Sequence, residues 1–299
     1  MIYLEEFYLL SDDQEWNFFR RRSKGCYDSF YPYQLFPQKQ LREIVFSDVT
    51  IFCGSNGSGK STVLNIIGEK LKLKRNTPYN KTDFFDPYLS GCSSSFRNED
   101  PLKMYDLMKV SRFISSDDVF NHIIGVRERN ANLSFKREVT SRDIAQIKKY
   151  GWGNGPRGFN AEDPENMKSF LDYCQKLRGS SVNYIRTNVG VDERTYSNGE
   201  NGFKYFTDDI QPRGLYLLDE PENSLSAEMQ LKLAQFILSM ARFYDCQFIM
   251  STHSPLILSI PFARIYNMDE VPVSTCKWTE LPNIKLYYEF FRDHQAEFE

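Results

Sequence analysis

Hydrophobic and polar positions along the chain predict strands and helices that alternate at both of its ends. Runs with the length and composition of strands lie at residues 2–10, 41–46, 49–53, 109–114, 214–218 and 247–250. Helices are expected where apolar side chains recur every three or four positions, at 62–67, from Val119 onward, and at 140–150, 164–178, 225–240 and 283–299. The run 214–218 is apolar almost throughout, as in a parallel strand that is buried on both faces. The pattern predicts an α/β fold.

Other segments interrupt this pattern. Residues 11–40 are aromatic and contain Tyr31-Pro32-Tyr33, which favours an ordered loop over a helix. Residues 75–103 are polar with little periodicity and predict a long surface excursion. The glycine-rich run 151–158 has no Lys-Ser after it, so we interpret it as a flexible surface loop and not as a second phosphate site. No heptad array is present, and we therefore expect no long coiled-coil insertion.

Composition indicates which partners the chain can attract. Its 299 residues, 41% of them hydrophobic, can form one large domain or two small ones. The net charge of −3 gives no overall attraction to nucleic acid or to an anionic membrane. The basic run from Arg20 to Lys24 leaves two alternatives open, a solvated face or a groove for nucleic acid.

The N-terminal sequence lacks the basic and apolar regions of a signal peptide. No apolar run reaches the length of a membrane span. The six cysteines show no CxxC spacing, so neither a disulfide framework nor a zinc site is expected. We therefore predict a cytoplasmic protein.

A glycine-rich loop follows the predicted strand 49–53 and precedes a predicted helix, which is the context of a phosphate-binding P-loop. The loop consists of Gly54, Ser55, Asn56, Gly57, Ser58, Gly59, Lys60 and Ser61. Its glycines let backbone N–H groups approach phosphates, and the helix start adds partial positive charge. Lys60 is expected to reach the β- and γ-phosphates, and the Ser61 hydroxyl to bind Mg²⁺. The alternative is a chance glycine-rich turn.

Two further strand ends carry polar residues suited to nucleotide chemistry. Asp219 and Glu220 end the strand 214–218, where one carboxylate can hold Mg²⁺ and the other can polarise an attacking water. The alternative is a pair of acids that only caps a strand. His253 follows the strand 247–250, at the sheet edge where ligands bind in open α/β folds. Ser197-Asn198-Gly199-Glu200 precedes a helical pattern and offers another anion-accepting helix start or an ordinary turn.

Together these motifs resemble the ATP-binding-cassette (ABC) type of P-loop ATPase, in which a P-loop, a signature motif, an Asp-Glu strand end and a switch histidine occur in this order. The sequence from Asp219 to Leu225 most resembles those of the soluble branch of the family, which comprises chromosome-maintenance, RecF-like and OLD-like AAA-family ATPases. Membrane-transporter ATPases match less well. The resemblance covers residues 1–75 and 190–270.

The resemblance implies a role for each matching position. The P-loop residues and Thr62 would bind the phosphates of ATP, with Ser61 and Asp219 on Mg²⁺. Glu220 would be the catalytic base, and His253 would sense the γ-phosphate. Ser197 and Gly199 would contact ATP that is held by a second subunit, in an ATP-sandwiched homodimer. The segment from Glu222 to Ser226 would couple the two sites.

The resemblance also implies a fold. It predicts a single ABC-type ATPase domain over residues 1–299 with a mixed sheet. A nucleotide-binding core lobe would comprise 1–100 and 207–299, and a helical signature lobe would comprise 101–206.

Several positions depart from the family pattern. The usual glutamine after a strand is replaced by Ser115-Ser116-Asp117-Asp118, which would either supply an oxygen ligand or cap a helix. The residue that contacts adenine is not defined, and Tyr31, Tyr33 and Phe36 are candidates by location. The OLD-like nuclease domain has no counterpart before residue 299.

The leading hypothesis is an ATPase that dimerises on ATP and drives or gates a partner. The partner would be a protein, such as a nuclease or toxin, or nucleic acid. Analogy with the family suggests DNA maintenance or phage defence. The alternatives are a nucleotide-gated binding module with little hydrolysis and the ATPase subunit of a membrane transporter.

Overall fold

The computed structural model describes residues 2–20, 29–98, 100–151, 164–178, 180–192 and 198–298. The chain forms two compact units, which are considered separately below. The first, here called the sheet unit, comprises Met1–Asn121 and Ser197–Glu299. The second, here called the helical unit, comprises His122–Tyr196. The predicted lobe boundaries at residues 100 and 207 differ from these divisions and stay a prediction.

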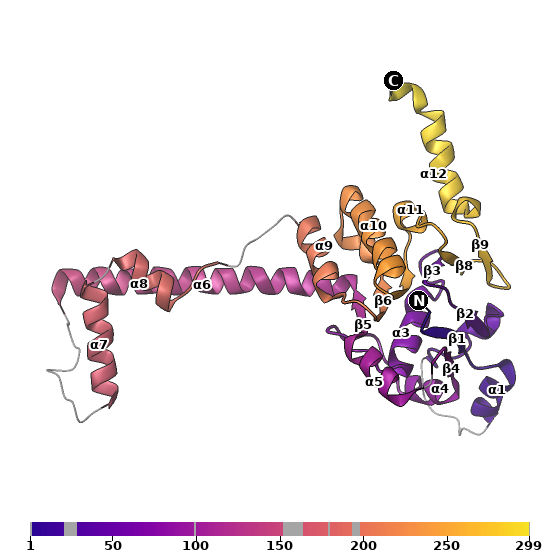
Figure 1. The fold of residues 1–299 in the computed structure, drawn as a ribbon, viewed down its shortest axis with the longest axis horizontal. Helices are drawn as coiled ribbons and strands as arrows, with labels where there is room; N and C mark the ends of the chain where they lie inside the picture. The colour runs from indigo at the N-terminus through magenta and orange to yellow at the C-terminus, as the bar shows by residue number, and fades with distance from the viewer. Residues whose placement is uncertain are drawn as a thin grey trace. The chain divides into compact units, whose positions relative to one another are not determined.

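The sheet unit is built around a six-stranded sheet in the order β5-β6-β7-β3-β8-β9 (Figure 1). The strands are β3 (Val49–Cys53), β5 (Arg112–Ser115), β6 (Leu215–Asp219), β7 (Gln247–Ser251), β8 (Arg264–Asn267) and β9 (Ser274–Cys276). All neighbours are parallel except β8 and β9, which pair antiparallel. Because β3 and β7 lie centrally, every one of their residues is buried, as their apolar sequences predict.

Side chains alternate between the two faces of this sheet. Leu217 and Ile249 belong to the core cluster that also contains residues of α3 (Lys60–Lys70), and α3 contacts both β6 and β7. Tyr216 and Phe248 belong to the opposite set of positions and stack on each other. The helix α10 (Ala227–Phe243) also contacts β7 and lies away from α3 (Figure 1). Helices thus cover the sheet on both sides.

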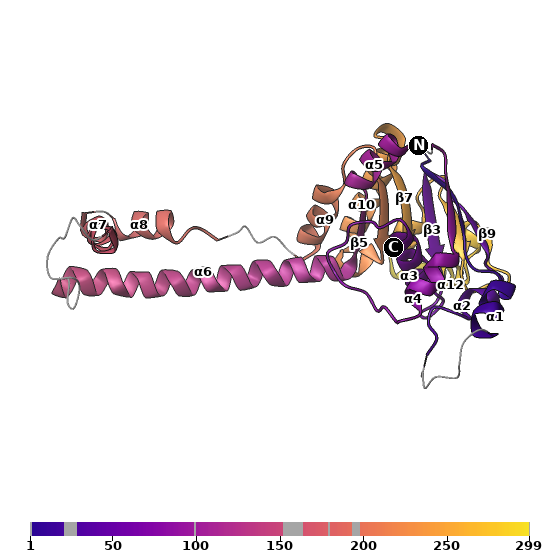
Figure 2. The same ribbon diagram turned by 90° about the horizontal axis from the view of Figure 1, so that it is seen from below.

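A second, antiparallel sheet, in the order β2-β1-β4, has its strands labelled in Figure 1 and lies beside the first (Figure 1 and Figure 2). Its strands are β1 (Leu4–Tyr8), β2 (Glu43–Val45) and β4 (Ser93–Phe96). Phe7 and Ile44 of this sheet are fully buried in the same core cluster as Phe52 of β3. The fold is therefore a mixed α/β structure with a P-loop, as predicted.

The structure contradicts two predictions for the N-terminal third of the chain. The segment 11–40 contains the helices α1 (Asp12–Arg20) and α2 (Leu35–Gln38) and is not only a loop. The segment 75–103 contains α4 (Phe85–Gly91) and β4 and leads into α5 (Pro101–Val110), so it is not a surface excursion. Its aromatic side chains Phe85 and Tyr88 are fully buried, which outweighs its polar average composition.

The helical unit contains most of α6 (Ser116–Tyr150), together with α7 (Pro164–Arg178) and α8 (Ser181–Asn188). A single helix of 35 residues replaces the separate helices predicted from 119 and at 140–150. Arg137 ties it to the segment after α8 through hydrogen bonds to Gly190 O and the Asp192 carboxylate. The continuity of this helix was not predicted, because it is polar on most of its faces; the expectation that no long coiled-coil insertion is present stays a prediction. The predicted loop 151–158 lies outside the described residues beyond Gly151.

The other helices of the sheet unit include two that the pattern predicts, α9 (Asn198–Asp209) and α12 (Pro282–Asp293), and one that it does not, α11 (Pro255–Leu258). α9 packs against α10 and the 3₁₀ turn η1 (Pro221–Ser224). The short helix α11 follows β7. The C-terminal helix α12 lies between the 3₁₀ turns η2 (Trp278–Glu280) and η3 (Gln295–Glu297). None of the helices in the described ranges is long and apolar enough to cross a membrane.

Candidate functional site

The P-loop connects the end of β3 at Cys53 to the start of α3 at Lys60. Gly57 and Gly59 adopt left-handed backbone angles, with φ of 80° and 96°, that glycine tolerates without steric cost. A Cβ atom on Gly54 would lie only 2.8 Å from Ser58 Oγ. The loop is therefore tight enough to require glycine, and it ends at a helix N-terminus whose first N–H groups lack intrahelical partners.

Lys60 lies folded over this loop. Its Nζ donates hydrogen bonds to Gly54 O at 3.0 Å and to Ser55 O at 3.1 Å, and burial lowers its pKa. The Ser58 hydroxyl is buried in the same loop without a hydrogen-bond partner in the described part of the chain. A phosphate group would supply the negative charge and the acceptor oxygens that these groups need. The loop therefore fits a phosphate ligand.

Asp219 lies at the tip of β6, beside Ser251 at the tip of β7. Its Oδ1 accepts hydrogen bonds from Ser61 Oγ at 2.9 Å and from Ser251 Oγ at 2.5 Å. Burial raises the pKa of Asp219. A hydroxyl and one carboxylate are oxygen ligands of the kind that Mg²⁺ takes together with substrate phosphates. Ser61 and Asp219 therefore fit Mg²⁺.

Glu220 and His253 face each other next to this pair. His253 Nε2 lies 3.6 Å from Glu220 Oε1, and Asn223 Nδ2 donates to Glu220 Oε2 at 2.9 Å. The interaction with His253 lowers the pKa of Glu220 and keeps this carboxylate ionised. Within the described ranges, His253 Nε2 is buried and makes no hydrogen bond of its own.

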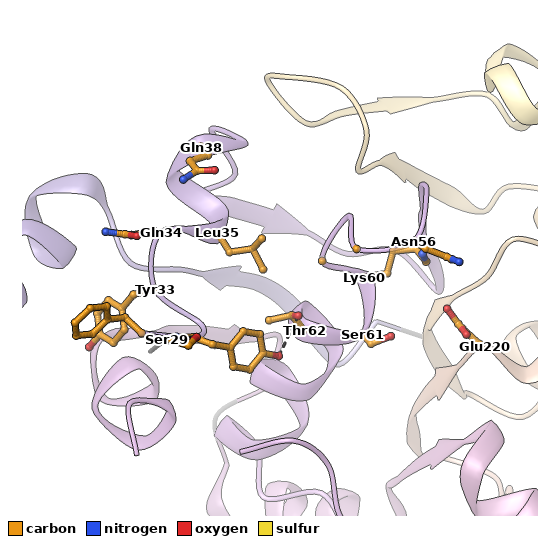
Figure 3. A pocket seen from close by; sticks show the side chains of 14 residues that line it. Ser29, Tyr33, Gln34, Leu35, Gln38, Asn56, Lys60, Ser61, Thr62 and Glu220 are labelled. Atoms are coloured by element: carbon orange, nitrogen blue, oxygen red, sulfur yellow. Dashed lines mark hydrogen bonds between the residues drawn. The ribbon is translucent and has the colours of Figure 1, made fainter. Parts of the chain in front are cut away.

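Lys60, Ser61 and Glu220 border a cavity of about 900 Å³ (Figure 3). Glu220 lies at the end of the cavity that also contains Lys60 and Ser61. Gln34 and Gln38 lie at the opposite end of the cavity. The other lining residues are Ser29, Phe30, Tyr31, Tyr33, Leu35, Asn56, Gly57, Gly59 and Thr62. The cavity thus extends from the P-loop to the segment around α2, which is large enough for a nucleotide.

The structure distinguishes the three aromatic candidates for an adenine contact. Tyr31 lines the cavity, and its hydroxyl donates to Thr62 Oγ1 at 3.0 Å. Tyr33 also lines the cavity but stacks on Phe18, with ring centroids 4.3 Å apart, and is largely buried. Phe36 is fully buried in the core. Leu35 was not predicted as a site residue, because its position in a short helix after Pro32 carries no motif.

The signature segment lies elsewhere in the sheet unit. Ser197 is outside the described residues. Gly199 lies in the first turn of α9, where a Cβ atom would be 3.3 Å from Ser226 N. Among the described residues that line the cavity, none comes from α9. Gly199 and the P-loop of one chain are therefore not brought together in one cavity.

The segment Ser115-Ser116-Asp117-Asp118, which stands where the family usually has a glutamine, forms the end of β5 and the start of helix α6. Ser115 N and Ser115 Oγ donate to Asp118 Oδ2 at 2.8 Å and 3.1 Å, and Asp118 N donates back to Ser115 Oγ at 3.3 Å. This reciprocal arrangement caps the N-terminus of α6. Of the two alternatives for this segment, the structure shows the helix cap. The basic run from Arg20 to Lys24 lies outside the described residues after Arg20.

Comparisons with known proteins were made for this chain. Residues 206–259, which include Asp219, Glu220 and His253, match the family model described as "AAA domain, putative AbiEii toxin, Type IV TA system". A search of curated proteins found no match. This match and the P-loop geometry support the resemblance stated above. The chain carries a P-loop domain that is similar to those of ABC-type ATPases.

Solved structures that resemble the chain include an Smc head domain with an extended coiled coil from Pyrococcus furiosus, bound to the C-terminal domain of ScpA. It has 14% identity and a TM-score of 0.41, covering 97% of this chain and 100% of the other. The SMC head domain from Thermotoga maritima has 14% identity and a TM-score of 0.36, covering 92% and 99%. A nucleotide-free ATP-binding cassette from an ABC transporter has 14% identity and a TM-score of 0.42, covering 96% and 99%.

Proposed function

We propose that this chain binds ATP with Mg²⁺, hydrolyses it, and forms an ATP-sandwiched homodimer. The observation that carries the proposal is the convergence of Lys60, Ser61, Asp219 and Glu220 at one edge of the sheet, next to a cavity of nucleotide size. Parallel strands place their carboxyl ends at this edge, so residues far apart in sequence meet there.

Each residue has a defined part in the proposed reaction. Backbone N–H groups of the P-loop and Lys60 Nζ hold the phosphates, and Ser61 with Asp219 holds the metal. Mg²⁺, when bound, offsets the negative charge that develops on the transferred phosphoryl group. Glu220, ionised because of its lowered pKa, accepts a proton from the attacking water. His253 lies beside Glu220 and completes the end of the site next to the γ-phosphate.

A dimer is proposed because one chain supplies only part of the site. Glu220 and His253 keep about a third of their side-chain surface exposed, with values of 30% and 33%. The N-terminus of α9, which carries Gly199, lies outside the cavity, and we propose that it meets the nucleotide of another copy. Ser197 and Gly199 of that copy would then contact the γ-phosphate.

A nucleotide-gated binding module with little hydrolysis is the second candidate. It is favoured by the use of Ser115 and Asp118 as a helix cap, which leaves no glutamine amide at the position that usually orients the attacking water. Under either proposal the chain acts in the cytoplasm, and its nucleotide-dependent closure changes the state of a partner protein or of nucleic acid. DNA maintenance and phage defence are the proposed settings, and an ATPase subunit of a transporter is the remaining alternative.

Steady-state turnover separates the two candidates. Wild-type protein should release phosphate from ATP only when Mg²⁺ is present, and Lys60→Ala should lose this activity by at least about 100-fold because the phosphates lose their main cationic contact. Lys232→Ala is the matched control, since Lys232 is exposed and pairs with Glu228 in the preceding turn of α10. Strong thermal stabilisation by Mg-ATP without turnover would favour the binding module. Absence of both effects would contradict nucleotide binding.

A further inference from the structure

The turn after Glu220 directs the side chain of Glu222 toward the loop that carries His253. The 3₁₀ turn η1 begins directly after Glu220, which follows β6 and has a left-handed conformation with φ of 47°. Glu222 Oε1 accepts a hydrogen bond from the backbone N–H of His253 at 2.5 Å. The second oxygen, Oε2, is buried and has no hydrogen-bond partner among the described residues. Glu222 is therefore aimed at the backbone of His253 and not at solvent.

The Glu222 side chain supplies an acceptor for the backbone N–H of His253 at the point where the hydrogen bonds between β7 and β3 end. At the end of β7, the N–H of Thr252 still donates to Phe52 O of β3 at 3.2 Å. The next N–H, that of His253, finds its acceptor in the Glu222 side chain. A hydrogen bond to a carboxylate is stronger and more directional than one between neutral groups. Glu222 thus fixes the backbone at the first residue that leaves the sheet.

A second side chain joins the same two loops. Gln230 of α10 donates from Nε2 to Leu225 O at 3.0 Å, and its Oε1 accepts a hydrogen bond from Ser254 Oγ at 2.7 Å. Ser254 in turn caps α11 by accepting from Leu256 N at 3.2 Å. The segment after Glu220 and the segment around His253 are therefore held at two points, and of these two contacts it is that of Glu222 that fixes the His253 backbone.

We propose that Glu222 is a positioning residue that holds His253 in place by accepting its backbone N–H, so that the imidazole faces Glu220. The inference rests on the proposed function, because it assigns Glu222 to the same site. Glu222 makes no contact with the reacting groups in this assignment and acts through His253 alone. A shift of about 1 Å in a positioned group can reduce turnover by about 100-fold, so this hydrogen bond matters for catalysis more than for nucleotide binding.

Glu222→Gln keeps an oxygen that can accept the His253 N–H, and Glu222→Met keeps the volume of the side chain but removes the acceptor. Glu222→Met should lower kcat for ATP by about 10- to 100-fold while KM and the affinity for Mg-ATP change less than about threefold. Glu222→Gln should stay within about threefold of wild type in kcat, because it restores the hydrogen bond. Glu228→Gln, at an exposed carboxylate of α10 that pairs with Lys232, is the control and should leave kcat unchanged.

A second readout does not depend on hydrolysis. The chain has three histidines, His122, His253 and His294, so protein labelled with ¹⁵N-histidine gives a spectrum simple enough to assign by substitution. The amide proton of His253 should resonate downfield in wild type and in Glu222→Gln, and it should move upfield in Glu222→Met. This part of the test applies even to a wild-type protein that does not hydrolyse ATP, so it separates this inference from the proposed function.

Two results would overturn the assignment. The first is an unchanged His253 amide resonance in folded Glu222→Met. The second is a loss of kcat in Glu222→Gln as large as in Glu222→Met, since that would show that the carboxylate charge and not the hydrogen bond to His253 is required. Should Glu222→Met fail to fold, a large loss of kcat in Glu222→Gln, or a His253 amide resonance that moves upfield in Glu222→Gln, would still overturn the assignment.

Discussion

The hydroxyl of Ser61 donates a hydrogen bond to Oδ1 of Asp219 over 2.9 Å, across 158 positions of sequence. Ser61 belongs to the first turn of α3, which follows the P-loop strand β3, and Asp219 ends β6. The strand β7 lies between β3 and β6 in the sheet and contributes Ser251 to the same carboxylate oxygen. Two loops that are remote in the chain therefore meet at the position where the proposed nucleotide and metal bind.

This pair should account for the metal dependence of nucleotide binding. Asp219→Asn keeps the shape of the side chain but removes the charge that attracts Mg²⁺. Wild-type protein should therefore gain about 5 °C in Tm from ATP with Mg²⁺ compared with ATP and excess EDTA, and Asp219→Asn should lose most of this difference. Differential scanning fluorimetry measures it, with Asp209→Asn at the end of α9 as the control. An equal response to Mg²⁺ in wild type and Asp219→Asn would contradict the assignment of Asp219 to the metal.

Tyr31 should contribute to binding of the base. It lines the cavity and is attached to the P-loop helix through Thr62, whereas Tyr33 is committed to its stack on Phe18. Because stacking of a base on an aromatic ring contributes about 1–3 kcal/mol, Tyr31→Ala should raise the Kd for ATP by about tenfold or more. Tyr31→Phe should raise it less than about threefold, since the ring is kept. Isothermal titration calorimetry would show whether both variants instead bind like wild type, which would place the base elsewhere.

The stability of the protein should depend on pH through Glu222. Burial raises the pKa of Glu222 above its ordinary value of 4.5. A carboxyl group with a raised pKa in the folded state favours folding fully below its unfolded pKa, and this contribution is lost as the pH rises through the folded pKa. Glu222→Gln does not titrate, so its Tm should exceed that of wild type at about pH 8, and the two should converge near about pH 4.

Thermal unfolding of both proteins between these pH values checks the sign of the effect. Glu228→Gln is the matched control, because Glu228 is an exposed carboxylate on α10 that pairs with Lys232. Its Tm difference from wild type should be small at every pH. A Tm of Glu222→Gln that falls below wild type as the pH rises would show that the ionised carboxylate stabilises the fold, contrary to the expected direction.

Much of the site was predictable because its signals are local. The P-loop is a contiguous motif, and β6 and β7 are apolar runs that end in polar residues, so their tips could be placed at one sheet edge from sequence. Parallel pairing then brings Asp219 and Ser251 together. The individual contacts of Glu222 with His253 and of Gln230 with Ser254 could not be predicted, since they depend on how two loops of different strands approach each other.

The elements that were missed have weak local patterns. The strand β4 has the sequence Ser93-Ser94-Ser95-Phe96, which lacks a clear apolar alternation and forms because it pairs with β1. β8 and β9 are short, and they form as strands because β8 pairs with β3 and β9 pairs with β8. The long helix α6 has few apolar residues, so its continuity over 35 residues left no periodic signal strong enough to join its two predicted halves.

The central claim, an ATP-sandwiched dimer, is tested most directly by the mass of Glu220→Gln protein in saturating Mg-ATP. Removing the catalytic base should slow hydrolysis by about 100- to 10,000-fold and let the closed state accumulate. Light scattering should then give twice the chain mass of 35.1 kDa, whereas the Lys60→Ala Glu220→Gln double variant should remain monomeric. A Glu220→Gln protein that binds Mg-ATP yet stays at the mass of one chain would contradict the account.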